Sequence, residues 1–198
     1  MKIFSHFCPQ GQVNTYLVTE EKRKCDALII DPADLDADLI SIIEKYELNI
    51  AGLLVTHDHE QHVRGIGKIE KVYPCPVYAF KDSIQGFDTV RLREGKGVRI
   101  SDFSMDILYV PGHSPDSLAF VIGNCIFTGD TLAAGRVSTT TNNLAHAILT
   151  RNISQKIMTY DDNFLIFPGH GCPTKIRIER LFNHDLLESE VQLSENLF

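Results

Sequence analysis

Short apolar runs separated by turn residues recur along most of the chain. Runs rich in Val, Ile, Leu and Phe, bounded by Gly, Pro, Asn or Asp, are typical of β-strands. The predicted strands are residues 2–7, Val13–Thr19, Cys25–Ile30, Ile50–Val55, Pro76–Phe80, Val98–Ile100, Met105–Val110, Leu118–Ile122, Cys125–Phe127 and Phe164–Phe167. The early strands follow one another directly, whereas the later ones are separated by longer segments.

Those longer segments carry apolar residues at helical spacing. The clearest case is a helix over residues 35–46, marked by Leu35, Leu39, Ile42, Ile43 and Tyr46. We expect a second helix after His62, a third that begins at Asn142 or Asn143 and reaches Ile157, and a fourth over Ile176–Leu187. Strands followed by alternating strands and helices predict an α/β protein in which helices cover the outer faces of the sheets.

Composition and charge limit the setting. A chain of 198 residues with 43% hydrophobic content can form one substantial core, so we expect a single domain over residues 1–198. The net charge of −7 and the lack of a Lys/Arg run argue against a nucleic-acid partner. The densest basic stretch, Arg91–Arg99, also holds Glu94 and is predicted to be a solvated loop.

Cysteine use and the N-terminal residues favour a cytoplasmic protein. The five cysteines are odd in number and show no Cys-x-x-Cys spacing, and Met1–His6 lacks the apolar core of a signal peptide. A reducing compartment fits this pattern best. No window approaches the roughly 18 apolar residues that span a bilayer, so no membrane partner is expected.

Histidine is concentrated in three short motifs that suggest a metal site. They are Thr56-His57-Asp58-His59-Glu60-Gln61-His62, Pro111-Gly112-His113 and Pro168-Gly169-His170-Gly171, and Gly129-Asp130-Thr131 lies between the last two. Zn²⁺ binds neutral imidazole nitrogens and carboxylate oxygens at similar distances. Histidines two residues apart on an extended segment point to the same side, and His62 joins them if a helix begins there. Every candidate follows a predicted strand, where α/β proteins place their chemistry.

The order of these motifs, beginning with Asp31, resembles the metallo-β-lactamase superfamily of metallohydrolases. That resemblance implies a four-layer αββα sandwich. Gly129-Asp130-Thr131-Leu132 and Pro168-Gly169-His170-Gly171-Cys172-Pro173-Thr174, followed by Glu179-Arg180 and Asn183, resemble the short glyoxalase II-like branch. This branch comprises thioesterases related to hydroxyacylglutathione hydrolase that lack the additional C-terminal helical domain.

The resemblance implies the roles of the site residues. One metal would be held by His57, His59 and His113, a second by His62 and His170, and Asp130 would bridge them. The implied cofactor is one or two zinc ions, with iron as an alternative. An activated water would attack a thioester or a related ester. Asp31 would orient the ligands, although an ordinary Asp before Pro32 at the start of a helix is an equal interpretation.

One position departs from the family pattern His-x-His-x-Asp-His, because Gln61 stands where the family has Asp. A unit charge near a cation is worth about 4 kcal/mol at an effective dielectric near 20, which is roughly a thousandfold in affinity. We therefore expect the His57/His59/His113 site to fill first and the second site to be weak or empty. By alternation, Asp58 and Glu60 should point away from the histidines.

Two alternatives to a hydrolase stay open at this stage. The first is a mononuclear Fe(II) oxygenase resembling the persulfide dioxygenases of the same superfamily, with His57, His113 and Asp130 as the ligands. The second is a binding or regulatory protein in which Gln61 marks lost catalysis.

The expected partner is a small-molecule substrate, and the sequence is silent on oligomeric state. Arg136, Lys175 and Arg177 could meet a carboxylate or phosphate, although surface roles are more common for such residues. The run 138–141 is either a loop over the site or a plain connection. Cys172 is predicted to be a small buried filler.

Overall fold

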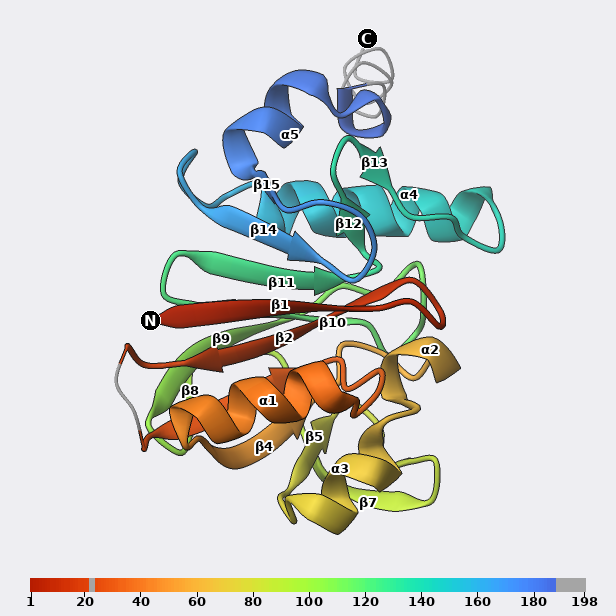
Figure 1. Ribbon diagram of the computed structural model, residues 1–198. Coiled ribbons are helices and arrows are strands. Elements are labelled where there is room, and N and C mark those ends of the chain that lie inside the picture. Colours follow the sequence, from red (N-terminus) through yellow and green to blue (C-terminus); the bar gives the residue numbers. More distant parts are fainter. Residues whose placement is uncertain (22–23, 188–198) are drawn as a thin grey trace, which may run out of the picture.

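Two β-sheets face each other at the centre of the computed structural model, which describes residues 1–21 and 24–187 (Figure 1). One sheet has seven strands in the order β1-β2-β3-β4-β5-β7-β6, and the other has six in the order β15-β14-β11-β10-β9-β8. Helices α1 to α3 cover the outer face of the first sheet, and α4 and α5 cover that of the second. The predicted four-layer αββα sandwich is therefore confirmed.

The first sheet joins an antiparallel meander, β1 to β3, to a parallel set formed by β3, β4, β5 and β7. Its strands are β1 (Lys2–Cys8), β2 (Val13–Thr19), β3 (Asp26–Ile30), β4 (Asn49–Leu54), β5 (Val77–Ala79), β6 (Ser83–Ile84) and β7 (Phe87–Arg91). The helices that cover it are α1 (Ala37–Tyr46), α2 (Glu60–Val63) and α3 (Ile66–Val72).

The second sheet is antiparallel from β8 to β11, and β14 then adds in parallel beside β11. Its strands are β8 (Gly95–Ile100), β9 (Phe103–Tyr109), β10 (Leu118–Ile122), β11 (Cys125–Gly129), β14 (Leu165–Pro168) and β15 (Thr174–Lys175). A separate hairpin pairs β12 (Leu132–Ala133) with β13 (Arg136–Val137). The remaining helices are α4 (Asn143–Asn152), a π-helical turn (Ile153–Ile157) and α5 (Ile176–Phe182).

Strand alternation divides the apolar residues between the layers. On β2, Tyr16 and Val18 pack between the sheets, whereas Leu17 joins the cluster under α1. Side chains on a strand point alternately to its two faces, so a strand buried on both sides supplies two cores. The inter-sheet core includes Phe120 and Phe127, both fully buried.

The predicted elements are present with small shifts of their ends, but two details differ. The helix expected after His62 is two helices separated around Gly65, and the helix expected over Ile176–Leu187 breaks at Asn183, so that α5 ends at Phe182 and residues 184–187 form a separate helical turn. The third helix begins where predicted, since Asn142 accepts a hydrogen bond from the Ala145 amide (2.9 Å).

The prediction of a solvated loop over Arg91–Arg99 was wrong. Residues up to Arg91 belong to β7, and Gly95–Ile100 form β8 at the edge of the second sheet. Charged residues are common on edge strands because they discourage pairing with another sheet. The charge pattern therefore indicated exposure correctly but not the backbone conformation.

Within residues 1–21 and 24–187, no helix is both long enough and apolar enough to cross a membrane. All five cysteines lie in this part of the chain, and they form no disulfide with one another.

Candidate metal centre

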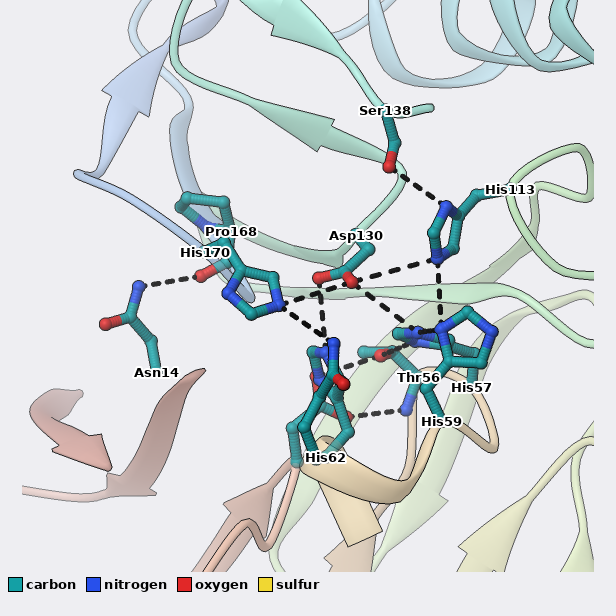
Figure 2. Close-up of polar contacts among 12 residues, drawn as sticks. Asn14, Thr56, His57, His59, His62, His113, Asp130, Ser138, Pro168 and His170 are labelled. Carbon is teal, nitrogen blue, oxygen red and sulfur yellow. Dashed lines mark hydrogen bonds and ion pairs between the residues drawn. The ribbon is translucent and has the colours of Figure 1, made fainter. Parts of the chain in front are cut away.

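The predicted ligands come together at one edge of the sandwich, where strands of both sheets end (Figure 2). From the first sheet come His57 and His59, after β4, and His62, on α2. From the second sheet come His113 after β9, Asp130 after β11 and His170 after β14. Residues far apart in sequence thus converge because both sheets present their strand ends at the same edge.

The first group contains three imidazole nitrogens that face one another. His57 Nε2 lies 2.9 Å from His59 Nδ1, which lies 3.2 Å from His113 Nε2. Ligand atoms around a tetrahedral zinc with bonds near 2.0–2.1 Å are separated by about 3.3 Å. Asp130 Oδ2 is 3.7 Å from both His57 Nε2 and His113 Nε2. These four residues therefore have the spacing of one cation site.

The second group shares Asp130 with the first. His62 Nε2 is 3.2 Å from Asp130 Oδ1, and His170 Nε2 is 3.4 Å from Asp130 Oδ2. The carboxylate lies between the two sets of nitrogens (Figure 2). It could therefore contact two cations at once.

Hydrogen bonds on the far side of the rings fix which nitrogen is available. His113 Nδ1 donates to the carbonyl of Thr139 (3.0 Å), and His170 Nδ1 donates to the carbonyl of Gln12 (2.8 Å). A carbonyl can only accept, so the proton must be on Nδ1 in both rings. The Nε2 lone pair of each ring then points into the cluster, as metal ligation requires.

Asp31 orients two further ligands. Its carboxylate accepts hydrogen bonds from the Thr56 hydroxyl (2.8 Å) and from His62 Nδ1 (3.0 Å). Because the Thr56 hydroxyl gives its proton to Asp31, it can accept one from His57 Nδ1, 3.0 Å away. Asp31 is 2% exposed, and the residue that caps α1 is Asp36. The interpretation of Asp31 as a residue that starts this helix was therefore wrong.

Two buried polar atoms in the cluster, His62 Nε2 and Asp130 Oδ1, lie 3.2 Å apart and have no hydrogen-bond partner other than each other in the described part of the chain. Buried polar atoms without partners are costly, and an ion is one of the accepted reasons for their presence. Together with the aimed lone pairs and the ligand spacing, they fit a metal-binding His/Asp cluster.

The electrostatics of the cluster differ between its two halves. Burial and the neighbouring His62 lower the pKa of His57 to about 3, so this ring is neutral. Burial also opposes a charge on His62, but Asp31 and Asp130 outweigh it and raise its pKa to about 10. Against its own burial, contacts with His170 and His62 hold the pKa of Asp130 far below its ordinary value.

Two glycines allow the loops to approach one another. Gly129 has φ +50°, and a side chain there would collide with Thr56. A Cβ at Gly169 would lie 2.6 Å from both Asp130 Oδ1 and His62 Cε1. The Gly-Asp and Pro-Gly-His motifs thus place backbone where no side chain fits.

Gln61 lies at the cluster, with its amide nitrogen 3.4 Å from His170 Nε2. The amide therefore stands beside the second group of ligands. Asp58 points away, as predicted, and pairs with Lys81 (2.7 Å). Glu60 is exposed at the start of α2. Neither acidic neighbour replaces the carboxylate that the family pattern has at position 61.

A cavity of about 440 Å³ opens over the cluster. Its lining consists of His59, Gln61, His113, Gly129, Asp130, Ala133, Arg136, Val137, Ser138, Thr139 and His170.

The loop interpretation of residues 138–141 is supported, since Ser138 and Thr139 both contact His113. Arg136 is the one basic residue in this lining, which includes neither Lys175 nor Arg177. Cys172 was predicted to be buried but is exposed, in the exposed segment 171–173 that joins β14 to β15.

Sequence reasoning did not identify the residues that hold the His170 loop. Asn14 Nδ2 donates to the carbonyls of Pro168 (3.1 Å) and Gly171 (2.8 Å), and the Tyr16 hydroxyl also donates to Pro168 (2.6 Å). These bonds link residues more than 150 positions apart. Only the polar Asn14 at the start of a buried strand offered a sequence signal.

No protein-family model matches the chain. It is 34% identical over 124 residues to a hydroxyacylglutathione hydrolase from Hahella chejuensis, a match that covers 60% of this chain and 48% of that protein. It therefore spans about half the length of that relative. It is also 26% identical over 196 residues to hydroxyacylglutathione hydrolase GloC from Haemophilus influenzae, covering 87% and 92% of the two chains.

Solved structures share the fold. The B3 metallo-β-lactamase BLEG-1 matches 93% of this chain and 99% of its own, with a TM-score of 0.83 and 22% identity. ETHE1 from Myxococcus xanthus matches 100% of this chain and 91% of its own, with a TM-score of 0.83 and 25% identity. TTHA1623 in a di-iron-bound form matches 91% and 98%, with a TM-score of 0.77 and 25% identity.

Proposed function

Because the chain belongs to the metallo-β-lactamase superfamily, we propose that it is a metal-dependent hydrolase of a thioester or a related ester. The observation that carries the proposal is the convergence of five histidine nitrogens and the Asp130 carboxylate beneath an open cavity. A cation held by such ligands lowers the pKa of a water toward neutrality and polarises a carbonyl oxygen. The hydroxyacylglutathione hydrolases among the relatives support the thioester class.

We assign the first cation, zinc or iron, to His57, His59, His113 and Asp130. The second group, His62 and His170 with the shared Asp130, would hold a weaker cation because Gln61 is neutral. Asp130 stays ionised and its side chain is only 8% exposed, so it offers a full negative charge to either position. Asp31 and the backbone carbonyls of Gln12 and Thr139 keep the imidazoles in the orientation that ligation requires.

The residues that line the cavity suggest which groups of the substrate they would contact. Ser138 and Thr139 beside His113, and Gln61 beside His170, place polar groups next to the ligands, and Arg136 places a positive charge on the wall. A guanidinium binds carboxylates in a planar, two-point geometry. We therefore expect a substrate whose acyl or thiol portion carries an anionic group. A thiolate leaves without much protonation, so no dedicated general acid is required for a thioester.

The test is hydrolysis of a small panel of thioesters and esters, including S-lactoylglutathione, by the protein as purified, after chelation and after metal is restored. We expect turnover that is lost on chelation and returns with the metal. Asp130→Asn should abolish it, while Arg136→Gln should raise KM for anionic substrates and leave neutral ones unaffected. Hydrolysis that persists in Asp130→Asn or after complete chelation would reject the proposal.

A second candidate is an Fe(II) oxygenase that uses His57, His113 and Asp130. This mononuclear site is favoured by the adjacent placement of its three ligands, and the di-iron form of one structural relative supports the choice of iron as the metal. Bound iron with oxygen uptake dependent on a sulfide or persulfide would select this candidate. Metal binding with neither activity would select a binding or regulatory role instead.

A further inference from the structure

Three loops from both sheets meet beside the first group of ligands. One follows β4 and carries His57 and His59, one follows β9 and carries His113, and one follows β5 and carries Lys81. The first two bring the three nitrogens of this group together. Because they belong to different sheets, the relative position of the loops sets the distance between His59 and His113.

A buried carboxylate, Asp116, joins these loops. Its Oδ2 atom accepts a hydrogen bond from the backbone amide of Asp58 (3.0 Å), the residue between the two histidines of the first loop. Its Oδ1 atom accepts from the hydroxyl of Ser114, the residue after His113. Asp116 is 5% exposed, so these bonds are shielded from water. One carboxylate oxygen thus contacts the loop that carries His57 and His59, and the other contacts the loop that carries His113.

Lys81 completes the arrangement from the third loop. Its ammonium group lies 2.7 Å from Asp58 Oδ2 and 3.7 Å from Asp116 Oδ2. Lys81 is half exposed, so this ion pair is open to solvent and contributes little. The buried bonds from the Asp58 amide and the Ser114 hydroxyl are charge-assisted and therefore stronger.

We propose that Asp116 is a positioning residue that holds the His57/His59 loop and the His113 loop at the spacing that the first cation requires. The inference rests on the proposed metal site but not on the reaction. A second link between the loops runs from the Leu118 amide to the Thr56 carbonyl (2.8 Å), so it holds the residue before His57 but not the segment 58–59. Without Asp116, the amide of Asp58 loses its buried acceptor, and the segment 57–59 is free to shift relative to His113.

The experiment is a Co²⁺ titration of the metal-free full chain against a competing chelator, followed by visible absorption. Residues that orient metal ligands typically contribute about 10- to 100-fold to metal affinity. We expect Asp116→Asn, which keeps the shape but loses the charge, to weaken the first Co²⁺ about 10-fold, and Asp116→Ala about 100-fold. The absorption of the bound ion should change in both variants, because the ligand geometry is altered. Lys81→Gln is the matched control and should change affinity less than about 3-fold.

Thermal unfolding of each metal-free variant separates positioning from stability. Co²⁺ affinity is measured well below the unfolding temperature, so a purely structural role would lower that temperature and leave affinity and absorption unchanged. If Asp116→Ala does not fold, Asp116→Asn and Ser114→Ala, which removes one of the two bonds, decide the matter. If Asp116→Asn binds Co²⁺ as tightly as the unaltered chain, or if Lys81→Gln loses as much Co²⁺ affinity as Asp116→Asn, the role of Asp116 is overturned and the proposed function is not. Absence of Co²⁺ binding by the unaltered chain would overturn the proposed function as well.

Discussion

The substitution Gln61→Asp tests why this chain should bind its two cations unequally. The Gln61 amide lies 3.4 Å from His170 Nε2, and the side-chain ligands of the second group lie within 4.8 Å of one another. A carboxylate that reaches the place of the Gln61 amide would stand about 4 Å from a cation in that group. At an effective dielectric near 20, one unit charge at this distance contributes about 4 kcal/mol, or roughly a thousandfold in affinity.

Two companion variants separate charge from shape. Gln61→Glu adds the charge and keeps the side-chain length, whereas Gln61→Asn shortens the side chain without adding charge. We expect Gln61→Asp and Gln61→Glu to strengthen binding of the second metal by about 100- to 1000-fold, the lower value allowing for partial exposure of the site. Gln61→Asn should bind the second metal no better than the unaltered chain.

The assay is isothermal titration of metal-free protein with Zn²⁺ in the presence of a competing chelator. The unaltered chain should show one tight and one weak equivalent, and the two acidic variants should show two tight equivalents. The reasoning is refuted if the unaltered chain already binds two ions tightly, or if a carboxylate at position 61 leaves the second equivalent weak.

Three further predictions concern Asp31, His62 and Glu179. Asp31→Asn should weaken metal binding by about 10- to 100-fold in chelator competition, because the negative charge is lost and one of the two oxygens that accept from Thr56 and His62 becomes an amide donor. Unchanged affinity would contradict the role given to Asp31. The pKa of His62 is raised to about 10, so at neutral pH this ring is protonated and the second cation must displace that proton. Metal titration in buffers of different ionisation enthalpy should therefore show proton release. The affinity for the second cation should rise with pH up to about pH 10. Net proton uptake would contradict this assignment. Glu179 is fully buried and accepts hydrogen bonds from the Gly135 amide, Thr174 and Asn183, so Glu179→Ala should lower the free energy of unfolding by about 3 kcal/mol or more in urea denaturation. A loss below about 1 kcal/mol would show that these donors find other partners.

The spacing of apolar residues predicted the layers of the sandwich because that spacing depends on which faces of a strand or helix are buried. A strand such as Val13–Thr19 is apolar on both faces, and the helix over residues 35–46 has one apolar face, so their place in the sandwich could be inferred. The charged strand β7 gave no such signal, and of β8 only the end, Val98–Ile100, was predicted as a strand. At the edge of a sheet, backbone pairing does not need an apolar side chain, and Arg91 and Arg99 look the same in a strand as in a loop.

The candidate ligands could be predicted because each stands in a short motif of distinctive residues. The residues that support them could not. Asp116 and Asn14 act through contacts with loops far along the chain, and an Asp or Asn in a turn is common for local reasons. For Asp31 the local motif allowed two interpretations, and only its contact with His62 decided between them.

The most direct test of the account is metal content per chain, measured by elemental analysis on the same chelator-free preparation that is assayed with S-lactoylglutathione. We predict one firmly held metal per chain, a second that is lost on dialysis, and hydrolysis that disappears when the first is removed. A preparation that holds its metal in full and hydrolyses neither this thioester nor the others in the panel would contradict the assignment as a hydrolase.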